Sequence, residues 1–139
     1  MSPIRLLLIQ ANPCRGAPLD LDVEQRNLQE EIQASRRAVE MAVHVLPAGR
    51  IADLPVYLRR CEPHIVHLGC HGDGEGGLHL NAPGDQDGEV LGADELAQIV
   101  AAYQAEADDR LRLAVLAGCW TEATAERLAV KSPKFGDFA

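Results

Sequence analysis

Two stretches of sequence decide the fold: His64-Ile65-Val66-His67-Leu68-Gly69-Cys70-His71-Gly72-Asp73-Gly74 and Leu113-Ala114-Val115-Leu116-Ala117-Gly118-Cys119-Trp120. Each begins as a short apolar run, typical of a buried parallel strand, and stops at a reactive residue that has a glycine next to it. The first presents the imidazole of His71 and the second the thiol of Cys119. Reactive groups gather beyond the carboxyl ends of parallel strands. The sequence therefore predicts that His71 and Cys119 meet, as in a Cys-His hydrolase.

Strand-like and helix-like segments alternate along the rest of the chain. Apolar runs predict strands at 4–9, 42–46, 65–69 and 111–116. Helical spacing and capping residues predict helices from Asp22 to about Ala38, from Asp53 up to Pro63, from Asp94 onward, and from near Thr121 to about Val130. Short runs on either side of Pro83-Gly84-Asp85 predict a small hairpin outside the main sheet. This alternation predicts an α/β sandwich with a mostly parallel sheet of about four strands and flanking helices.

The composition fits a single domain and excludes several classes of partner. The chain has 139 residues and a net charge of -8, from 21 acidic and 13 basic side chains. Nucleic acid is not expected as a partner, because phosphate binding needs clustered Lys and Arg. A membrane span is not expected either, because the longest apolar runs are far shorter than the ~20 residues required. We expect one domain at residues 1–130, followed by a flexible tail at 131–139.

The cysteines indicate a reducing compartment. Cys14, Cys61, Cys70 and Cys119 lie far apart, form no C-x-x-C pair, and follow no N-terminal signal peptide. Reduced thiols in a cytoplasmic protein account for this pattern.

The chemistry of a nucleophilic cysteine requires a group that removes or stabilises its proton. Cys119 lies just before a predicted helix, whose N-terminal end favours a thiolate, and His71 is the second candidate activator. The glycines suggest that the backbone N–H groups of Gly72 and Cys119 form an oxyanion hole. Trp120, Asp73 and His67 are expected to line this site.

These residues allow other interpretations. Cys119 could be a small buried hydrophobic residue and His71 a turn residue. A metal site among His64, His67, Cys70 and His71 is not expected, because neighbours on a strand face opposite sides, so that His67 and His71 point one way and the other two point the other. A phosphate-binding domain is disfavoured because the glycine-rich loop after His71 lacks the P-loop lysine. No cofactor is expected.

Together these motifs resemble the CHAT domain family of caspase-like cysteine peptidases. The match includes the first strand ending in Ala11-Asn12-Pro13, the helix start at 19–26, the segment 65–72 with Gly76-Gly77-Leu78 after it, and the segment 113–119. The resemblance implies a caspase-like fold, a peptide-bond substrate, His71 as general base and Cys119 as nucleophile. It also implies regulated proteolysis in bacteria, under the control of a sensor or partner.

The chain departs from the family pattern in two respects. Ala117-Gly118 stands before the cysteine and Trp120 after it, where the family usually has Asn-Ala before and Ser soon after. The family domain also continues well past this point, so about half of it is expected to be missing. The sequence is therefore compatible with two functions. The first is a cysteine endopeptidase that acts through an acyl-enzyme. The second is a non-catalytic interaction module that pairs with another chain, or with a second copy, through an open sheet edge.

Overall fold

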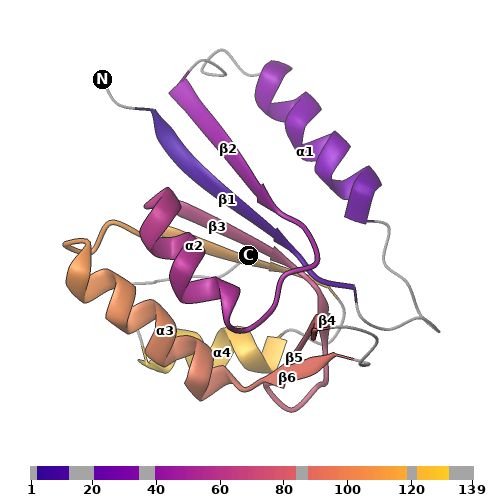
Figure 1. The fold of residues 1–139 in the computed structure, drawn as a ribbon, viewed down its shortest axis with the longest axis vertical. Helices are drawn as coiled ribbons and strands as arrows, with labels where there is room; N and C mark the ends of the chain where they lie inside the picture. The colour runs from indigo at the N-terminus through magenta and orange to yellow at the C-terminus, as the bar shows by residue number, and fades with distance from the viewer. Residues whose placement is uncertain (1–2, 13–20, 35–39, 84–87, 119–121, 132–139) are drawn as a thin grey trace.

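The main sheet has four parallel strands in the order β2-β1-β3-β7 (Figure 1). The computed structural model describes residues 3–12, 21–34, 40–83, 88–118 and 122–131. The strands are β1 (Ile4–Gln10), β2 (Met41–Leu46), β3 (Ile65–Gly69) and β7 (Leu113–Ala117). Side chains 6–9 of β1 are all buried, which explains its continuous apolar run: it lies inside the sheet and is covered on both faces.

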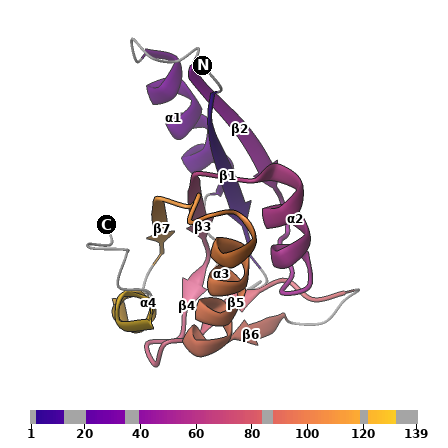
Figure 2. The same cartoon turned by 90° about the vertical axis from the view of Figure 1, so that its left-hand side faces the viewer.

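Helices cover both faces of this sheet, so the predicted α/β sandwich is confirmed (Figures 1 and 2). One face carries α1 (Leu21–Ala34), and the other carries α2 (Asp53–Cys61) and α3 (Ala93–Glu106). The last helix, α4 (Glu122–Lys131), packs beside α3. The crossovers between the neighbouring parallel strands β1 and β2, and β3 and β7, contain α1 and α3 respectively, as parallel pairing requires.

A second, antiparallel sheet lies at the carboxyl end of β3. It contains β4 (His71–Gly72), β5 (Leu78–Leu80) and β6 (Glu89–Leu91) in that order. The predicted small hairpin is therefore confirmed as β5 and β6, and the His71 segment forms a third strand of the same sheet.

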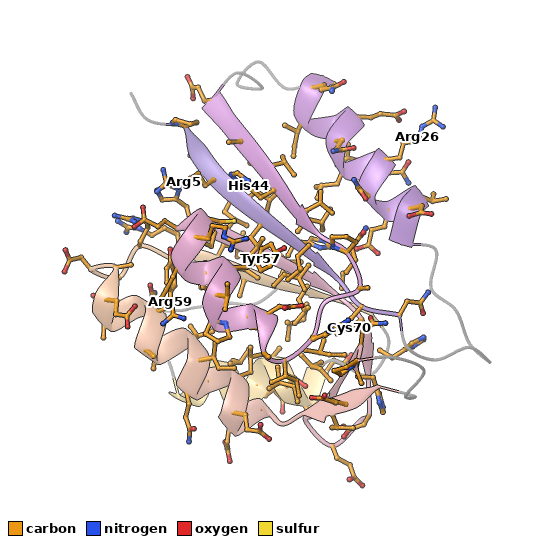
Figure 3. All side chains as sticks on the ribbon, in the orientation of Figure 1. Arg5, Arg26, His44, Tyr57, Arg59 and Cys70 are labelled. Carbon is orange, nitrogen blue, oxygen red and sulfur yellow. The ribbon has the colours of Figure 1, made fainter. Side chains whose placement is uncertain are left out.

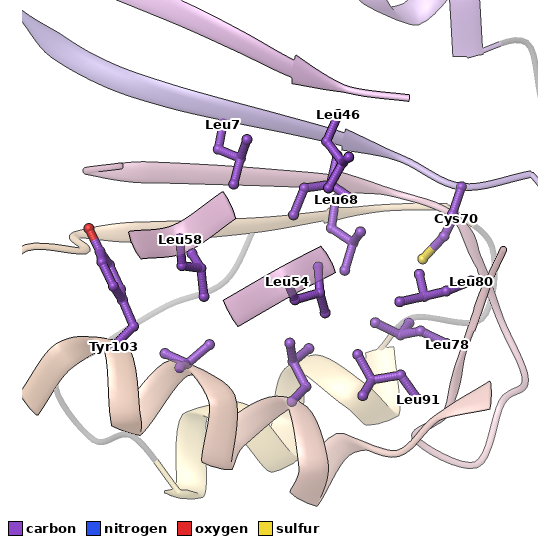
Figure 4. Packing of buried hydrophobic residues seen from close by; sticks show 14 of the residues in the cluster. Leu7, Leu46, Leu54, Leu58, Leu68, Cys70, Leu78, Leu80, Leu91 and Tyr103 are labelled. Carbon is purple, nitrogen blue, oxygen red and sulfur yellow. The ribbon is translucent and has the colours of Figure 1, made fainter. Parts of the chain in front are cut away.

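The hydrophobic core cluster joins this small sheet to the main one. Leucines of β1, β3 and α2 meet Tyr103 of α3 and the fully buried Leu78, Leu80 and Leu91 of the small sheet (Figure 4). Because each buried leucine contributes about 2 kcal/mol, the core fixes the His71-bearing sheet against the main one.

Two predicted helix caps, Asp22 and Asp53, were wrong in detail, and the helix expected to open at Asp94 begins one residue earlier. Asp22 and Asp94 are each the second residue of their helices, and Asp53 is the first residue of α2. The positions before α2 and α3 are Ala52 and Gly92, neither of which makes a side-chain capping bond. Asp53 instead accepts a hydrogen bond from the backbone N–H of Arg50 at 3.1 Å. Acidic residues in a first helical turn are favourable there through the helix dipole, so they mark a helix start without being its cap.

The last strand of the main sheet begins later than predicted. Leu111 precedes β7. The side chain of Gln104 on α3 accepts a hydrogen bond from the N–H of Leu111 at 2.9 Å and donates one to the carbonyl of Leu111 at 2.8 Å. This side chain replaces a strand partner, so an apolar and buried residue lies outside the sheet. The predicted end of the first helix at Ala38 lies outside the described residues.

Candidate active site

The carboxyl ends of β3 and β7 lie side by side, as the sequence predicts. Gly69 is the register partner of Ala117, and the N–H of Cys70 donates to the carbonyl of Ala117 at 3.2 Å. His71 lies two residues after Gly69 in the sequence, and Cys119 lies two residues after Ala117. Cys119 and Trp120 themselves lie outside the described residues, as does Cys14.

His71 does not continue β3, so the alternation used to orient it from sequence was wrong. The chain leaves the main sheet after Gly69, and His71 lies in β4, where it pairs with His79 of β5. Cys70, by contrast, belongs to the core cluster beneath α2 and α3. His64 lies at the opposite end of β3, where its Nδ1 accepts from the backbone N–H of Arg5 at 2.9 Å.

His79 is a residue to which sequence reasoning assigned no role. Residues directly opposite each other in an antiparallel pair project to the same face, with Cβ atoms about 5 Å apart. The imidazoles of His71 and His79, both half-buried, therefore share one face of the hairpin. The turn-rich run between Gly72 and Gly77, flanked by two short apolar stretches, is the signal that could have predicted this pairing.

Asp73 lies in the five-residue loop that joins β4 to β5. Its Oδ1 accepts hydrogen bonds from the N–H groups of Glu75 and Gly77, at 2.7 and 2.8 Å. These bonds hold the pKa of the Asp73 carboxyl below its ordinary value, with a smaller contribution from the charge of His79. The carboxylate, expected to line the site, is thus engaged within its own loop.

The described thiols are poorly suited to act as nucleophiles. Cys70 is 1% exposed, and burial, reinforced by Glu24, raises the pKa of its thiol to about 12. Burial also raises the pKa of Cys61, against the opposing charge of Arg60. Figures 3 and 4 show Cys70 at the end of the main sheet, with its sulfur directed toward Leu80 and Leu78. Both residues are free cysteines, as expected for a reduced protein.

His67 contacts α1. Its Nε2 lies 3.5 Å from Oε1 of Glu24, and its side chain is 14% exposed. The Nδ1 of His67 is buried and has no hydrogen-bond partner among the described residues. A role for His67 in lining the site stays a prediction, as does the use of the Gly72 N–H in an oxyanion hole.

A cleft of about 330 Å³ adjoins the loop that follows His71. Gly74 of the loop and Glu122, Ala123 and Glu126 of α4 line it. Glu122 and Glu126 lie one helical turn apart, so both carboxylates project from the same side of α4. Their charges make this part of the cleft favourable for a cationic group.

The described residues contain neither a cluster of metal ligands nor a helix that could span a membrane. No three His, Cys, Asp or Glu side chains among them are grouped closely enough to hold a metal ion. None of the described helices combines the length and the apolar composition that crossing a bilayer demands.

A parallel sheet between helices, with a small antiparallel sheet at the carboxyl end of its strands, defines this chain as a caspase-like α/β sandwich. The family model of the CHAT domain matches residues 2–131. The chain therefore belongs to the CHAT domain family, which is related to the caspase-like peptidases. A search of curated proteins gave no match.

Proposed function

We propose that this chain is a cysteine-type endopeptidase domain in which His71 is the general base and Cys119 the nucleophile. The observation that carries the proposal is the register of β3 and β7, which pairs Gly69 with Ala117. Membership of a peptidase-related family supports the class of activity. The burial of Cys61 and Cys70, which raises the pKa of both thiols, makes these two of the four cysteines unfavourable nucleophiles.

The proposed reaction has two steps. His71 takes the proton of the Cys119 thiol, and the thiolate attacks the carbonyl carbon of the peptide bond. The N–H groups of Gly72 and Cys119 would stabilise the oxyanion, and the imidazolium returns its proton to the leaving amine as the C–N bond breaks. Water, deprotonated by His71, then hydrolyses the thioester and regenerates the thiol. Because α4 begins at Glu122, its N-terminal end lies close in sequence to the thiolate and favours its charge.

The substrate would be an extended segment of a protein or peptide. The cleft beside the His71 loop offers a place for one of its side chains. The free thiols of Cys61 and Cys70 support a cytoplasmic location.

Peptide cleavage by the chain, compared with that by two variants, tests this proposal. A mixture of unstructured peptides would be incubated with the wild type, with Cys119→Ser and with His71→Gln, and new termini would be identified by mass spectrometry. We expect cleavage by the wild type and a loss of at least about a thousandfold in both variants. Equal product formation by all three proteins would refute the assignment.

The second candidate function is an interaction module that pairs through its sheet edge. In the described part of the chain, β7 pairs with β3 alone, so its other edge carries unpaired backbone groups. A strand from a partner protein or from a second copy could add there. If the wild type cleaves nothing, concentration-dependent sedimentation would be measured. Its loss in Leu116→Pro, at a position whose N–H faces away from β3, would favour this candidate over the peptidase.

A further inference from the structure

Asp73 closes the loop directly after His71-Gly72 with three hydrogen bonds. Its Oδ1 accepts from the N–H groups of Glu75 and Gly77, and its own N–H donates to the carbonyl of Gly77 at 3.0 Å. The last two of these bonds cross the mouth of the loop, where β4 ends and β5 begins. The carboxylate thus fixes both the turn and the spacing of the two strands.

Gly77 is fitted to this carboxylate. A Cβ atom at position 77 would collide with Oδ2 of Asp73 and would lie 2.8 Å from Cγ1 of Val90 on β6. Two other glycines of the loop, Gly74 and Gly76, have positive φ angles of 82° and 101°, which residues with a side chain rarely adopt. The segment 73–77 is therefore adapted to a single conformation built around one carboxylate.

The loop acts on His71 through the shortest strand of the small sheet. β4 has only two residues, His71 and Gly72, and they pair with His79 and Leu78. A strand this short has few backbone hydrogen bonds of its own, so the closure at Asp73 is a large part of what holds it. Leu78 is fully buried and anchors the opposite strand to the core.

We infer that Asp73 is a positioning residue, whose carboxylate holds the hairpin that carries His71 and orients His71 toward its reaction partner. This inference rests on the proposed function of His71 as general base. Asp73 touches neither the substrate nor the thiol in this scheme, and its whole effect passes through His71.

The test measures alkylation of Cys119 by iodoacetamide in the full chain, followed by peptide mass spectrometry over a range of pH. We expect Asp73→Ala to lower the neutral-pH rate by about tenfold, because a displacement of about 1 Å can cost much more than this in a reacting pair. Asp73→Asn should retain the rate within about twofold, because its amide oxygen accepts the same N–H bonds. Glu75→Ala is the matched control, since it keeps the backbone N–H that Asp73 binds.

A double-mutant cycle separates positioning from a general loss of structure. In a His71→Ala background, Asp73→Ala should change the rate by less than about twofold, because an effect that passes through His71 vanishes with it. Circular dichroism would confirm that each variant is folded at the assay temperature. If Asp73→Ala does not fold, Gly77→Ala displaces the same carboxylate, and we expect the same loss of rate.

The outcomes distinguish this inference from the function on which it rests. If Cys119 reacts faster in the wild type than in His71→Ala, yet Asp73→Ala leaves the rate unchanged, the positioning role is overturned and the dyad stands. An equal effect of Asp73→Ala in both backgrounds overturns it as well. If His71→Ala itself leaves Cys119 unchanged, the proposed function fails first.

Discussion

Truncation of Leu80 to alanine should destabilise the domain by about 3 kcal/mol. Leu80 lies in β5, is fully buried, and belongs to the core cluster that holds the small sheet (Figure 4). The change removes three carbon atoms, and at about 0.8 kcal/mol for each buried carbon the transfer cost is about 2.4 kcal/mol. The cavity left behind adds to this, since Leu→Ala changes in well-packed cores cost about 2–5 kcal/mol.

Urea denaturation followed by circular dichroism measures this effect. A loss of about 3 kcal/mol is a large share of the roughly 5–15 kcal/mol that stabilises most domains, so the midpoint should fall clearly below that of the wild type. Val90→Ala is the matched control. Val90 lies on the neighbouring strand β6 but is 51% exposed, so its truncation should change the free energy of unfolding by less than about 0.5 kcal/mol.

The result bears directly on the candidate site. Leu80 is next to His79, which is the strand partner of His71. A loss below about 1 kcal/mol for Leu80→Ala, or equal losses for Leu80→Ala and Val90→Ala, would contradict the packing of the small sheet on the core. The position of His71 relative to β7 would then lose its physical basis.

Three further predictions concern pH, thiol reactivity and charge. Burial and neighbouring arginines lower the pKa of His64 in the folded protein. Its contribution to stability is therefore full above the pKa of about 6.5 in the unfolded chain, and is lost as the pH falls through the lower pKa of the folded state. The urea midpoint should fall less between about pH 7.5 and 5 in His64→Asn than in the wild type. With a pKa of about 12, roughly 3 in 100,000 of the Cys70 thiols are ionised at about pH 7.5, against about one in ten for an ordinary thiol. Iodoacetamide should therefore label Cys70 about three-thousandfold more slowly than free cysteine, and labelling at the free rate would contradict its burial. The double variant Glu122→Gln/Glu126→Gln should lose about tenfold in kcat/KM for peptides with a basic side chain, and little for neutral peptides. The control variant Glu31→Gln, at an exposed position on α1, should lose nothing. Equal losses on both kinds of peptide would refute a role for charge in the cleft.

The main sheet could be predicted from sequence because its strands are nearly continuous apolar runs. Segment 4–9 is typical of a strand covered on both faces, and β1 has that environment. That both segments end at the same edge also follows, because the carboxyl ends of parallel strands share one edge, but the pairing of Gly69 with Ala117 is a finding of the structure.

The placement of His71 could not be predicted in the same way. The chain passes from one sheet to another at Cys70, and no local pattern marks that change, because the residues on both sides are compatible with one strand. The pairing of His71 with His79 is set instead by the tight loop at Asp73 and by the burial of Leu78. Tertiary contacts of this kind decide register where a two-residue strand cannot.

The most direct test of the central claim is the pH dependence of Cys119 alkylation in the wild type and in His71→Ala. The account predicts that Cys119 reacts faster than free cysteine near neutral pH, and that its half-maximal rate moves toward the ordinary thiol range of about pH 8.5 when His71 is removed. Superimposable profiles for the two proteins, both matching an ordinary thiol, would contradict it.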